Sequence, residues 1–332
     1  MKVRLEEGSG GAPMAELLEK WVFPALKNDL LAQGHDAAQL EAVGPLAITT
    51  DSYVVKPLFF PGGDIGKLAA CGTLNDLAMA GAKPLALTLG LILEEGFDKR
   101  SLQVILTSLA AAARAAGVEV VTGDTKVVEA GKGDGLYLNT TGIGRRLRKE
   151  IFGPGSLQVG QKILINGGVA QHGLAILAAR EGLDLGGVIE SDCADLSGLC
   201  NLLVEQFAGV RLLKDPTRGG LASTLNELAQ ASGLCLELHE PSIPIDPKVE
   251  AGCGLLGLDP LSVANEGKFL AFVDPQAAPA VLEALLNHPL GQGAAIIGEV
   301  KAAPERKVVL VTSIGTRRVL DSPMGEQLPR IC

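Results

Sequence analysis

The clearest hydrophobic pattern lies between residues 46 and 82, where an apolar strand is followed by an apolar helix. The strand over 46–48 runs into two threonines and Asp51. A diglycine turn then leads to Asp64, which is placed to cap the following helix. The helix shows one face at the i, i+3, i+4 spacing, made of Ile65, Leu68, Gly72, Asp76 and Met79.

Asp76 shares that inward face with apolar residues. A lone carboxylate there is costly unless it is paired or bound to a metal. Asp51, at the end of the strand, and Asp76 could together hold a cation, and the diglycine turn between them favours a metal–phosphate site. A satisfied structural carboxylate is the alternative for Asp76.

The remaining pattern alternates strands and helices and predicts two α/β domains. Expected elements of the first half are a helix over 14–31, a strand over 85–93, a helix over 99–116 and strands over 118–121 and 136–144. A basic run at 145–149 and Gly153-Pro154-Gly155 then break the pattern. We therefore expect domains at 1–150 and 151–320, followed by a tail at 321–332.

The second half repeats the design of the first. Strands are expected over 162–166, 268–273, 294–300 and 307–311, and helices over 170–181, 196–207, 221–232 and 275–286. The segment Lys214-Asp215-Pro216-Thr217-Arg218-Gly219-Gly220 again joins an aspartate, a diglycine and an apolar helix. This similarity hints at a duplicated architecture.

Composition narrows the class of protein. The chain has 332 residues, 47% hydrophobic and 20% charged, which is typical of a packed globular protein. A net charge of −9 without a basic block argues against nucleic acid or an anionic membrane as partner. An acidic protein that binds a polyphosphate would need a divalent cation between the two.

Cysteine usage and hydropathy indicate a compartment. None of the six cysteines forms a C-x-x-C pair, so a zinc or iron–sulfur frame is not indicated. The N-terminus lacks a signal region, and no apolar run reaches the roughly 18 residues that span a bilayer. A reducing cytoplasm is therefore expected.

Three further segments carry candidate chemistry. Gly123-Asp124-Thr125-Lys126 follows a strand, and Asp124 would complete a three-carboxylate set with Asp51 and Asp76 that suits Mg²⁺. Glu266 interrupts an apolar context and is either a general base or a turn cap. The glycines at 8–11, including Gly10 and Gly11, precede a helix and form either an anion site or a flexible linker.

The end of the chain has a different character. Residues 321–332 lack periodicity, contain proline and glycine, and stop at Cys332. Twelve residues could extend roughly 40 Å, so the tail could present a terminal thiol as a swinging substrate arm. A frayed tail with an incidental cysteine is the alternative.

These motifs resemble the HypE family of hydrogenase maturation factors, within the superfamily of aminoimidazole-ribonucleotide synthetases (PurM-like). The resemblance covers nearly the whole chain, and the ending Pro329-Arg330-Ile331-Cys332 is its most specific part. The other segments that carry it are 8–11, 50–55, 61–64, 75–78, 123–126, 215–220 and 265–267.

The resemblance implies an ATP-dependent carbamoyl dehydratase. Such a protein receives a carbamoyl group on its terminal cysteine from the carbamoyltransferase HypF and dehydrates the S-carboxamide to an S-cyanide. The cyanide goes to iron on the HypC–HypD complex for [NiFe]-hydrogenase. The implied fold has two α/β domains, with N-terminal sheets pairing into a dimeric β-barrel across a homodimer, a C-terminal α/β sandwich and a flexible tail.

The resemblance also implies residue roles. Asp51, Asp76 and Asp124 would hold Mg²⁺ against ATP, Lys126 would contact the phosphates or the thiocarboxamide oxygen, and Glu266 would be the base, with Asp76 as competitor. Cys332 would carry the reacting group. The expected nucleotide-binding positions are Gly10, Gly11, Asp51, Gly62, Gly63, Asp64, Asn75, Asp76, Gly123, Asp124, Thr125 and Asp215.

Two alternatives stay open at this point. One is another PurM-like enzyme, either a selenophosphate synthetase or a thiamine-phosphate kinase. The first usually has a reactive cysteine near the glycine-rich start, and this chain has no cysteine before Cys71. The other is a non-catalytic assembly scaffold whose tail docks a partner.

Overall fold

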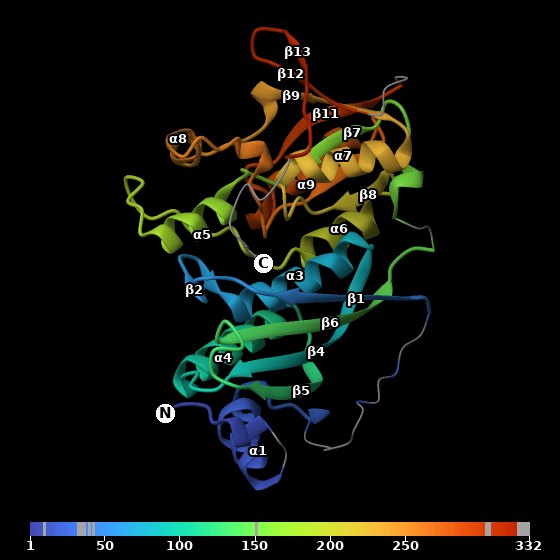
Figure 1. Ribbon diagram of the computed structural model, residues 1–332. Coiled ribbons are helices and arrows are strands. Elements are labelled where there is room, and N and C mark those ends of the chain that lie inside the picture. Colours follow the sequence, from blue (N-terminus) through green and yellow to red (C-terminus); the bar gives the residue numbers. More distant parts are fainter. Residues whose placement is uncertain are drawn as a thin grey trace.

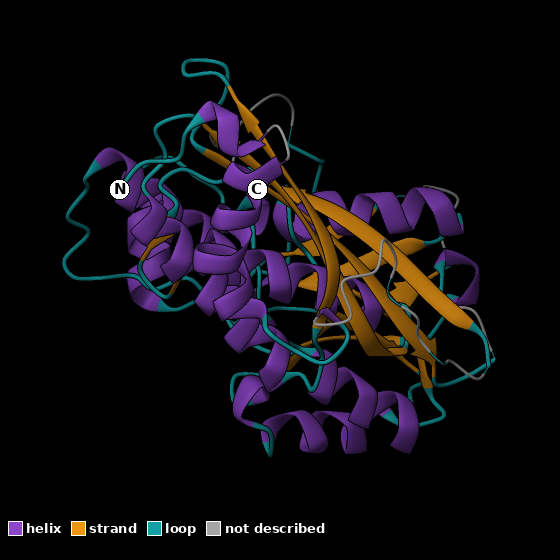
Figure 2. Cartoon of the chain, turned by 90° about the horizontal axis from the view of Figure 1, so that it is seen from below, coloured by secondary structure: helices purple, strands orange, loops and turns teal. Residues whose placement is uncertain are grey.

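Two helix-covered sheets lie one above the other and are joined through the residues after β6 (Figure 1). The computed structural model describes residues 1–8, 11–31, 38, 41, 44–149, 152–302 and 307–323. Seen from below, helices flank both groups of strands (Figure 2). No helix in these ranges is long and apolar enough to cross a bilayer.

The N-terminal sheet has four strands in the order β1-β6-β4-β5. Its pairs are antiparallel except β4 with β5, which are parallel. The strands are β1 (Leu46–Tyr53), β4 (Ala82–Glu94), β5 (Val120–Val128) and β6 (Leu136–Arg146). The other elements of this half are α1 (Gly11–Leu17), a π-helical turn (Leu18–Val22), α2 (Phe23–Leu26), β2 (Phe59–Phe60), β3 (Gly63–Asp64), α3 (Ile65–Met79) and α4 (Lys99–Ala115).

Helices α3 and α4 cover one face of this sheet. Leu68 of α3 and Ile105 of α4 are fully buried with Leu89 and Leu138 of the sheet. On the other face alternation leaves side chains uncovered, and Ile48 of β1 is 68% exposed. In a single chain this sheet therefore has one covered and one open face.

The C-terminal sheet has seven strands in the order β13-β12-β9-β11-β7-β10-β8. They are β7 (Lys162–Ile165), β8 (Val210–Lys214), β9 (Cys235–His239), β10 (Leu270–Val273), β11 (Ala295–Lys301), β12 (Val308–Val311) and β13 (Arg317–Val319). The helices are α5 (Gln171–Glu181), α6 (Ser197–Gln206), α7 (Gly220–Ser232), α8 (Pro247–Leu255) and α9 (Ala278–Leu286).

Alternating residues of the C-terminal strands build two separate cores. Phe272 of β10 packs with Leu225 of α7 on one face. Ala271 packs with Leu203 of α6 on the other, where Met79 of α3 joins the same cluster. This sheet is therefore covered on both faces, and the first domain contributes to its second core.

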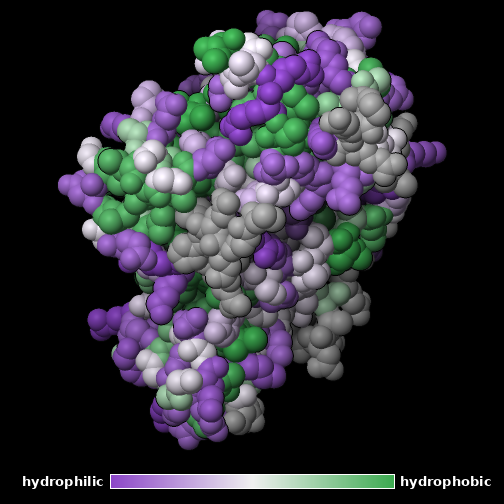
Figure 3. All heavy atoms as spheres, turned by 45° about the horizontal axis from the view of Figure 1, so that its top comes forward, coloured by the Kyte–Doolittle hydropathy of each residue, from purple (hydrophilic) through white to green (hydrophobic). Residues whose placement is uncertain are grey.

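Most expected elements are present within a few residues, and the exceptions have local causes. The first helical run ends at Leu26 rather than residue 31, because Lys27 leaves the helical conformation with ψ of 125°. The Asn28 amide then donates to the carbonyl oxygens of Leu26 and Val120. Strands β2, β3, β9 and β13 and helix α8 were not expected. On the face shown in Figure 3, hydrophobic residues gather in several separate patches among polar ones.

Candidate active site

A polar pocket lies where the two domains meet. It is built from β1 and α3 of the first domain and from the β8–α7 loop and the loop before β10 of the second. Its lining contains four carboxylates and two basic side chains; the residues are Asp51, Gly72, Asp76, Lys214, Asp215, Thr217, Arg218 and Glu266. The structure thus brings together Asp51, Asp76, Asp215 and Glu266, which the sequence had singled out.

Asp76 and Asp51 come from neighbouring elements of the first domain. The Thr49 hydroxyl of β1 donates to Asp76 Oδ2 at 2.8 Å, which fixes the carboxylate of α3 beside the strand. Burial and the charges of Asp215 and Asp51 raise the pKa of Asp76 to about 6, against the hydrogen bond from Thr49. Burial and the neighbouring carboxylates thus both disfavour the ionised form of Asp76.

Two basic residues face these carboxylates from the β8–α7 loop. Lys214 Nζ lies 2.9 Å from Asp215 Oδ1. Burial opposes the charged form, but Asp215 and the charge of Asp76 outweigh it and raise the pKa of Lys214. Arg218 is exposed and makes no hydrogen bond or ion pair with any described residue. The K-D-P-T-R-G-G segment was noted in the sequence, but only Asp215 was taken from it; Lys214, Thr217 and Arg218 were missed.

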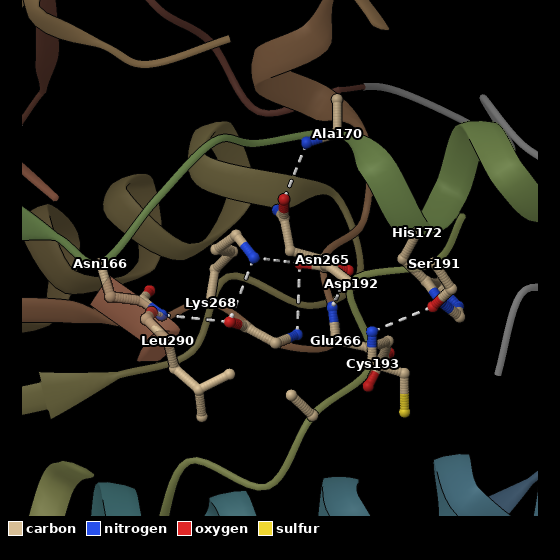
Figure 4. Close-up of polar contacts among 12 residues, drawn as sticks. Asn166, Ala170, His172, Ser191, Asp192, Cys193, Asn265, Glu266, Lys268 and Leu290 are labelled. Atoms are coloured by element: carbon tan, nitrogen blue, oxygen red, sulfur yellow. Dashed lines mark hydrogen bonds and ion pairs between the residues drawn. The ribbon is translucent and has the colours of Figure 1, made fainter. Parts of the chain in front are cut away.

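Glu266 is held by a clamp within the second domain (Figure 4). Asp192 accepts hydrogen bonds from the backbone N–H groups of Glu266 and Gly267 at 3.1 and 3.3 Å, and pairs with Lys268 Nζ at 3.1 Å. A Cβ on Gly267 would lie 1.8 Å from the Asp192 carbonyl oxygen, so only glycine fits. The clamp fixes the backbone of a carboxylate that is 5% exposed.

Asn75, expected to bind nucleotide, ties the two domains together. Its amide nitrogen donates to the carbonyl oxygens of Ala194 and Glu266 at 3.0 and 3.3 Å. Its amide oxygen accepts from Leu196 N at 2.8 Å. Both amide hydrogens and the oxygen are thus engaged by backbone of the second domain, and Asn75 positions the Glu266 loop against α3.

The turn before α3 is also used for packing. Asp64 caps the helix as expected, because its Oδ1 accepts from Gly66 N and Lys67 N at 2.7 and 3.0 Å. Gly62 has φ of +90°, and a Cβ there would lie 2.7 Å from the Ser191 carbonyl oxygen. The glycine therefore lets the turn approach the second domain closely, and Gly63 follows it in β3.

Asp124 does not join Asp51 and Asp76 within one chain. Asp51 pairs with Thr140, Thr140 with Leu89, and Leu89 with Gly123 across the sheet. Asp124, one residue on, therefore points to the opposite face, three strand spacings or about 14 Å away. Its side chain is 71% exposed. The three-carboxylate set expected from the sequence is thus not formed in a single chain, because strand register places its members on different faces.

The same strand register explains where the side chains of Lys126 and Thr125 point. Lys126 lies on the open face, where its Nζ pairs with Asp124 Oδ1 at 2.8 Å. It does not line the domain-boundary pocket, and the lysine that does is Lys214. Thr125 is buried, and Gly123 fits only as glycine, because a Cβ there would lie 2.3 Å from the Leu89 carbonyl oxygen.

Three of the positions predicted from the sequence lie near the ends of the chain. Gly10 and Cys332 lie outside the described residues, and Gly11 begins α1. The start of the tail is tied to α7: the Asn226 amide donates to the Leu320 carbonyl oxygen at 2.7 Å. Pro323, the last described residue, lies beside the glycine that precedes α7, with its Cγ 3.6 Å from where a Cβ of Gly219 would be.

His172 is fully buried and lies behind the Glu266 clamp. Its Nδ1 is 2.8 Å from Ser191 Oγ, while Nε2 has no partner among the described residues. Phe60 meets its ring edge-on, with 5.7 Å between ring centroids. Burial lowers the pKa of His172 to about 4, although the charge of Asp192 opposes this. The neutral ring fits a packing role.

The pocket suits a cation that arrives with a polyphosphate. No group of three or more His, Cys, Asp or Glu side chains in the described ranges is placed to hold a metal ion by itself. Asp51 and Asp76 nevertheless offer hard oxygen donors in the same pocket, where burial and the charges of Asp215 and Asp51 raise the pKa of Asp76. Mg²⁺ is commonly held by one or two carboxylates plus substrate phosphates.

Comparison with known proteins identifies the family. Residues 34–146 match the N-terminal domain of AIR synthase related proteins, and residues 158–311 match their C-terminal domain. Carbamoyl dehydratase HypE of Bradyrhizobium diazoefficiens is 50% identical over 332 residues, covering 99% of this chain and 96% of the relative.

Solved structures agree with this family assignment. A crystal structure of hydrogenase maturation protein HypE in complex with ATP has a TM-score of 0.96 at 45% identity, covering 99% of both chains. A HypE–HypF complex has a TM-score of 0.82 at 42% identity, covering 94% of this chain and 100% of that chain. The expected two-domain PurM-like fold is thereby confirmed, and the chain belongs to the HypE family of carbamoyl dehydratases.

Proposed function

We propose that this chain uses ATP to dehydrate an S-carboxamide on its own Cys332 to an S-cyanide. The observation that carries the proposal is the domain-boundary pocket, in which Asp51 and Asp76 of the first domain meet Glu266 of the second. Two carboxylates suited to a metal–phosphate complex thus lie beside a buried candidate base. Dehydration of an amide by ATP needs both.

The reaction balances in two steps. The carboxamide oxygen attacks the γ-phosphorus of ATP, ADP leaves, and one nitrogen proton passes to Glu266. As the C–O bond breaks, the second nitrogen proton passes to the departing phosphate, which gives S–C≡N and hydrogen phosphate. Phosphorylation matters because it turns a poor leaving group, the amide oxygen, into a good one.

Glu266 is suited to proton transfer because its backbone is fixed on both sides. Asp192 holds its N–H, and Asn75 holds its carbonyl oxygen. Because the backbone of the base is already fixed, little free energy is needed to orient it when the substrate binds. Mg²⁺ held by Asp51 and Asp76 would neutralise charge on the transferred phosphoryl group.

In a homodimer, Asp124 and Lys126 would lie between the two chains rather than in the domain-boundary pocket. Both lie on the open face of the N-terminal sheet, where Ile48 is 68% exposed. A homodimer that pairs these faces would cover Ile48 and bring the Asp124 and Lys126 side chains of both chains to the interface between the two sheets. We propose that nucleotide lies near this dimer interface.

Two partner classes follow from the proposed reaction. A carbamoyltransferase must supply the carbamoyl group, and a relative solved as a HypE–HypF complex supports HypF in that role. An iron-carrying acceptor must take the cyanide, which we assign to a HypC–HypD complex. The kinase, selenophosphate synthetase and scaffold alternatives are not favoured, because relatives that match nearly the whole chain are carbamoyl dehydratases.

Intact-mass spectrometry tests the proposal. The protein is incubated with HypF, carbamoyl phosphate and Mg-ATP, and the same is done with Cys332→Ala and Glu266→Gln. We expect the unaltered chain to gain one carbamoyl group and then lose one water. Glu266→Gln should stop at the carbamoylated form, and Cys332→Ala should stay unmodified. A carbamoylated chain that never loses water, with active HypF and bound ATP, would refute the dehydratase.

A further inference from the structure

We infer that Tyr53 is a positioning residue that fixes the separation of Asp51 and Asp76 and so makes their cation site selective for Mg²⁺ over Ca²⁺. The inference rests on the proposed function, in which these two carboxylates hold the metal of Mg-ATP. Its basis is a set of buried hydrogen bonds that ties β1 and β6 to α3 around Asp51.

Strand β1 runs alongside α3 and is tied to it on both sides of Asp51 (Figure 1). Residues 49, 51 and 53 share the face of the strand that is turned to the helix. On one side the Thr49 hydroxyl donates to Asp76 Oδ2 at 2.8 Å, and on the other the Tyr53 hydroxyl lies 3.1 Å from Thr73 Oγ1. Tyr53 is 1% exposed and Thr73 is fully buried, so water does not compete for the second tie.

The third tie comes from β6. Thr140 is the cross-strand partner of Asp51, and it is fully buried. Its hydroxyl bonds to Thr73 Oγ1 and donates to the Ala69 carbonyl oxygen at 3.2 Å. Because a carbonyl oxygen can only accept, the hydrogen of Thr140 points to Ala69. Thr73 must then donate to Thr140, and Tyr53 to Thr73, so this hydroxyl chain has a single arrangement that keeps all its bonds.

Each of the two carboxylates keeps one oxygen for a cation. Asp51 Oδ1 accepts from Ser52 N at 2.7 Å, and Asp76 Oδ2 is taken by Thr49. Among the described residues, Asp51 Oδ2 and Asp76 Oδ1 have no hydrogen-bond partner, and both side chains line the domain-boundary pocket. The separation of these two oxygens is therefore set by the ties between β1, β6 and α3 before any cation binds.

A fixed separation favours the ion with the stricter geometry. Mg²⁺ requires a nearly ideal octahedron with oxygens at about 2.0–2.1 Å, whereas Ca²⁺ accepts variable geometry at about 2.3–2.6 Å. Hydrogen bonds behind the ligands hold them in the required orientation. Without the Tyr53 hydroxyl, the end of β1 could shift against α3. Such a shift costs affinity for Mg²⁺, but a site for Ca²⁺ can adapt to it.

Calorimetry on the full chain tests the inference. The Kd of a non-hydrolysable ATP analogue is measured in excess Mg²⁺, in excess Ca²⁺ and in EDTA. The variants are Tyr53→Phe, Thr73→Val and Thr73→Ser, of which the last keeps the hydroxyl. Tyr137→Phe is the matched control, because the hydroxyl of this second tyrosine accepts from Asp134 N at 2.9 Å and does not line the pocket.

Tyr53→Phe should weaken binding in Mg²⁺ about fivefold, the effect of losing one hydrogen bond. Binding in Ca²⁺ and in EDTA should stay within about twofold, so the preference for Mg²⁺ falls by a similar factor. Thr73→Val should lose at least as much, because it breaks the hydroxyl chain in the middle. Thr73→Ser and Tyr137→Phe should keep the preference of the unaltered chain.

Three results would overturn the inference. Equal weakening of Tyr53→Phe in Mg²⁺, Ca²⁺ and EDTA would assign Tyr53 to the fold or to the nucleotide. An unchanged preference for Mg²⁺ in both Tyr53→Phe and Thr73→Val would show that the hydroxyl chain does not set the site. If the unaltered chain binds the analogue no better in Mg²⁺ than in EDTA, the metal site of the proposed function fails, and the inference falls with it.

Discussion

Replacing Asn75 by alanine should loosen the junction between the two domains. The side chain is 3% exposed and makes three hydrogen bonds to backbone of the second domain. Alanine leaves the Leu196 N–H and the Ala194 carbonyl oxygen without their Asn75 partner, and it leaves the Glu266 carbonyl oxygen with only the 3.4 Å hydrogen bond from Ala194 N. The Glu266 backbone, which the proposed reaction needs in place, is thus held less firmly.

The expected loss in the free energy of unfolding follows from the number of hydrogen bonds removed. At a net ~1 kcal/mol per hydrogen bond, three bonds amount to about 3 kcal/mol, and more where the abandoned groups stay dry. All of this free energy acts across the domain junction, because the donors and acceptors belong to different domains. The variant should therefore lose coupling between domains as well as stability.

Asn166→Ala is the matched control. Asn166 is 1% exposed and also makes three hydrogen bonds through its amide, to Gly267, Leu290 and Phe269, but all of them lie within the second domain. Differential scanning calorimetry should show Asn75→Ala unfolding in two separated transitions. Asn166→Ala should unfold the second domain at lower temperature without loosening the contacts of α3.

The rate of dehydration supplies a second readout for Asn75→Ala. We expect a lower kcat with little change in the KM for ATP, because Asn75 positions the Glu266 loop and does not line the pocket. A single sharp transition with unchanged midpoint and normal kcat would refute the reasoning. A loss of ATP binding without loss of stability would also refute it, and would support the nucleotide-binding role that the sequence predicted for Asn75.

Three further predictions concern the same region. The affinity for Mg-ATP, measured by calorimetry, should fall as pH drops through about 6, where Asp76 takes up a proton, and Asp76→Asn should bind weakly with little pH dependence. His172 stays neutral when folded, so protonation of the unfolded chain should remove about 3 kcal/mol of stability as pH falls from 6.5 to about 4, and urea unfolding of His172→Gln should lack this loss. Gly267→Ala should lower both the melting temperature and the dehydration rate, because its Cβ would meet the Asp192 carbonyl oxygen, whereas Gly254→Ala in α8, with open space around it, should not.

Local patterns in the sequence predicted what depends on local geometry. The cap at Asp64 and the grouping of Asp51 with Asp76 follow from spacing within some 30 residues, whereas α3 is buried on nearly all sides and Gly72 and Asp76 of its expected inward face are only partly buried. Each is a matter of helix period or strand end, which the residue order states directly. The acidic corner of the site could therefore be predicted without the fold.

Features that depend on distant segments could not be predicted in this way. Asp124 was expected at a strand end like Asp51, but it lies in the middle of β5, and its face is decided by register through two intervening strands. The motif around Asn75 is typical of nucleotide binding. Only the fold shows that the amide nitrogen of Asn75 donates hydrogen bonds to the carbonyl oxygens of Ala194 and Glu266. Such pairings are set by the packing of domains rather than by any pattern along the chain.

Tethering the reacting group to α7 changes the kinetics of the proposed reaction. A terminal cysteine confined within about 30 Å of Pro323 has an effective concentration on the order of 10 mM at its own pocket. Water loss should therefore be first-order and independent of protein concentration, with no Michaelis constant for the carboxamide. The site need not bind its substrate tightly, and weak contacts that orient the group are enough. The same tether allows one turnover per chain until an acceptor removes the cyanide.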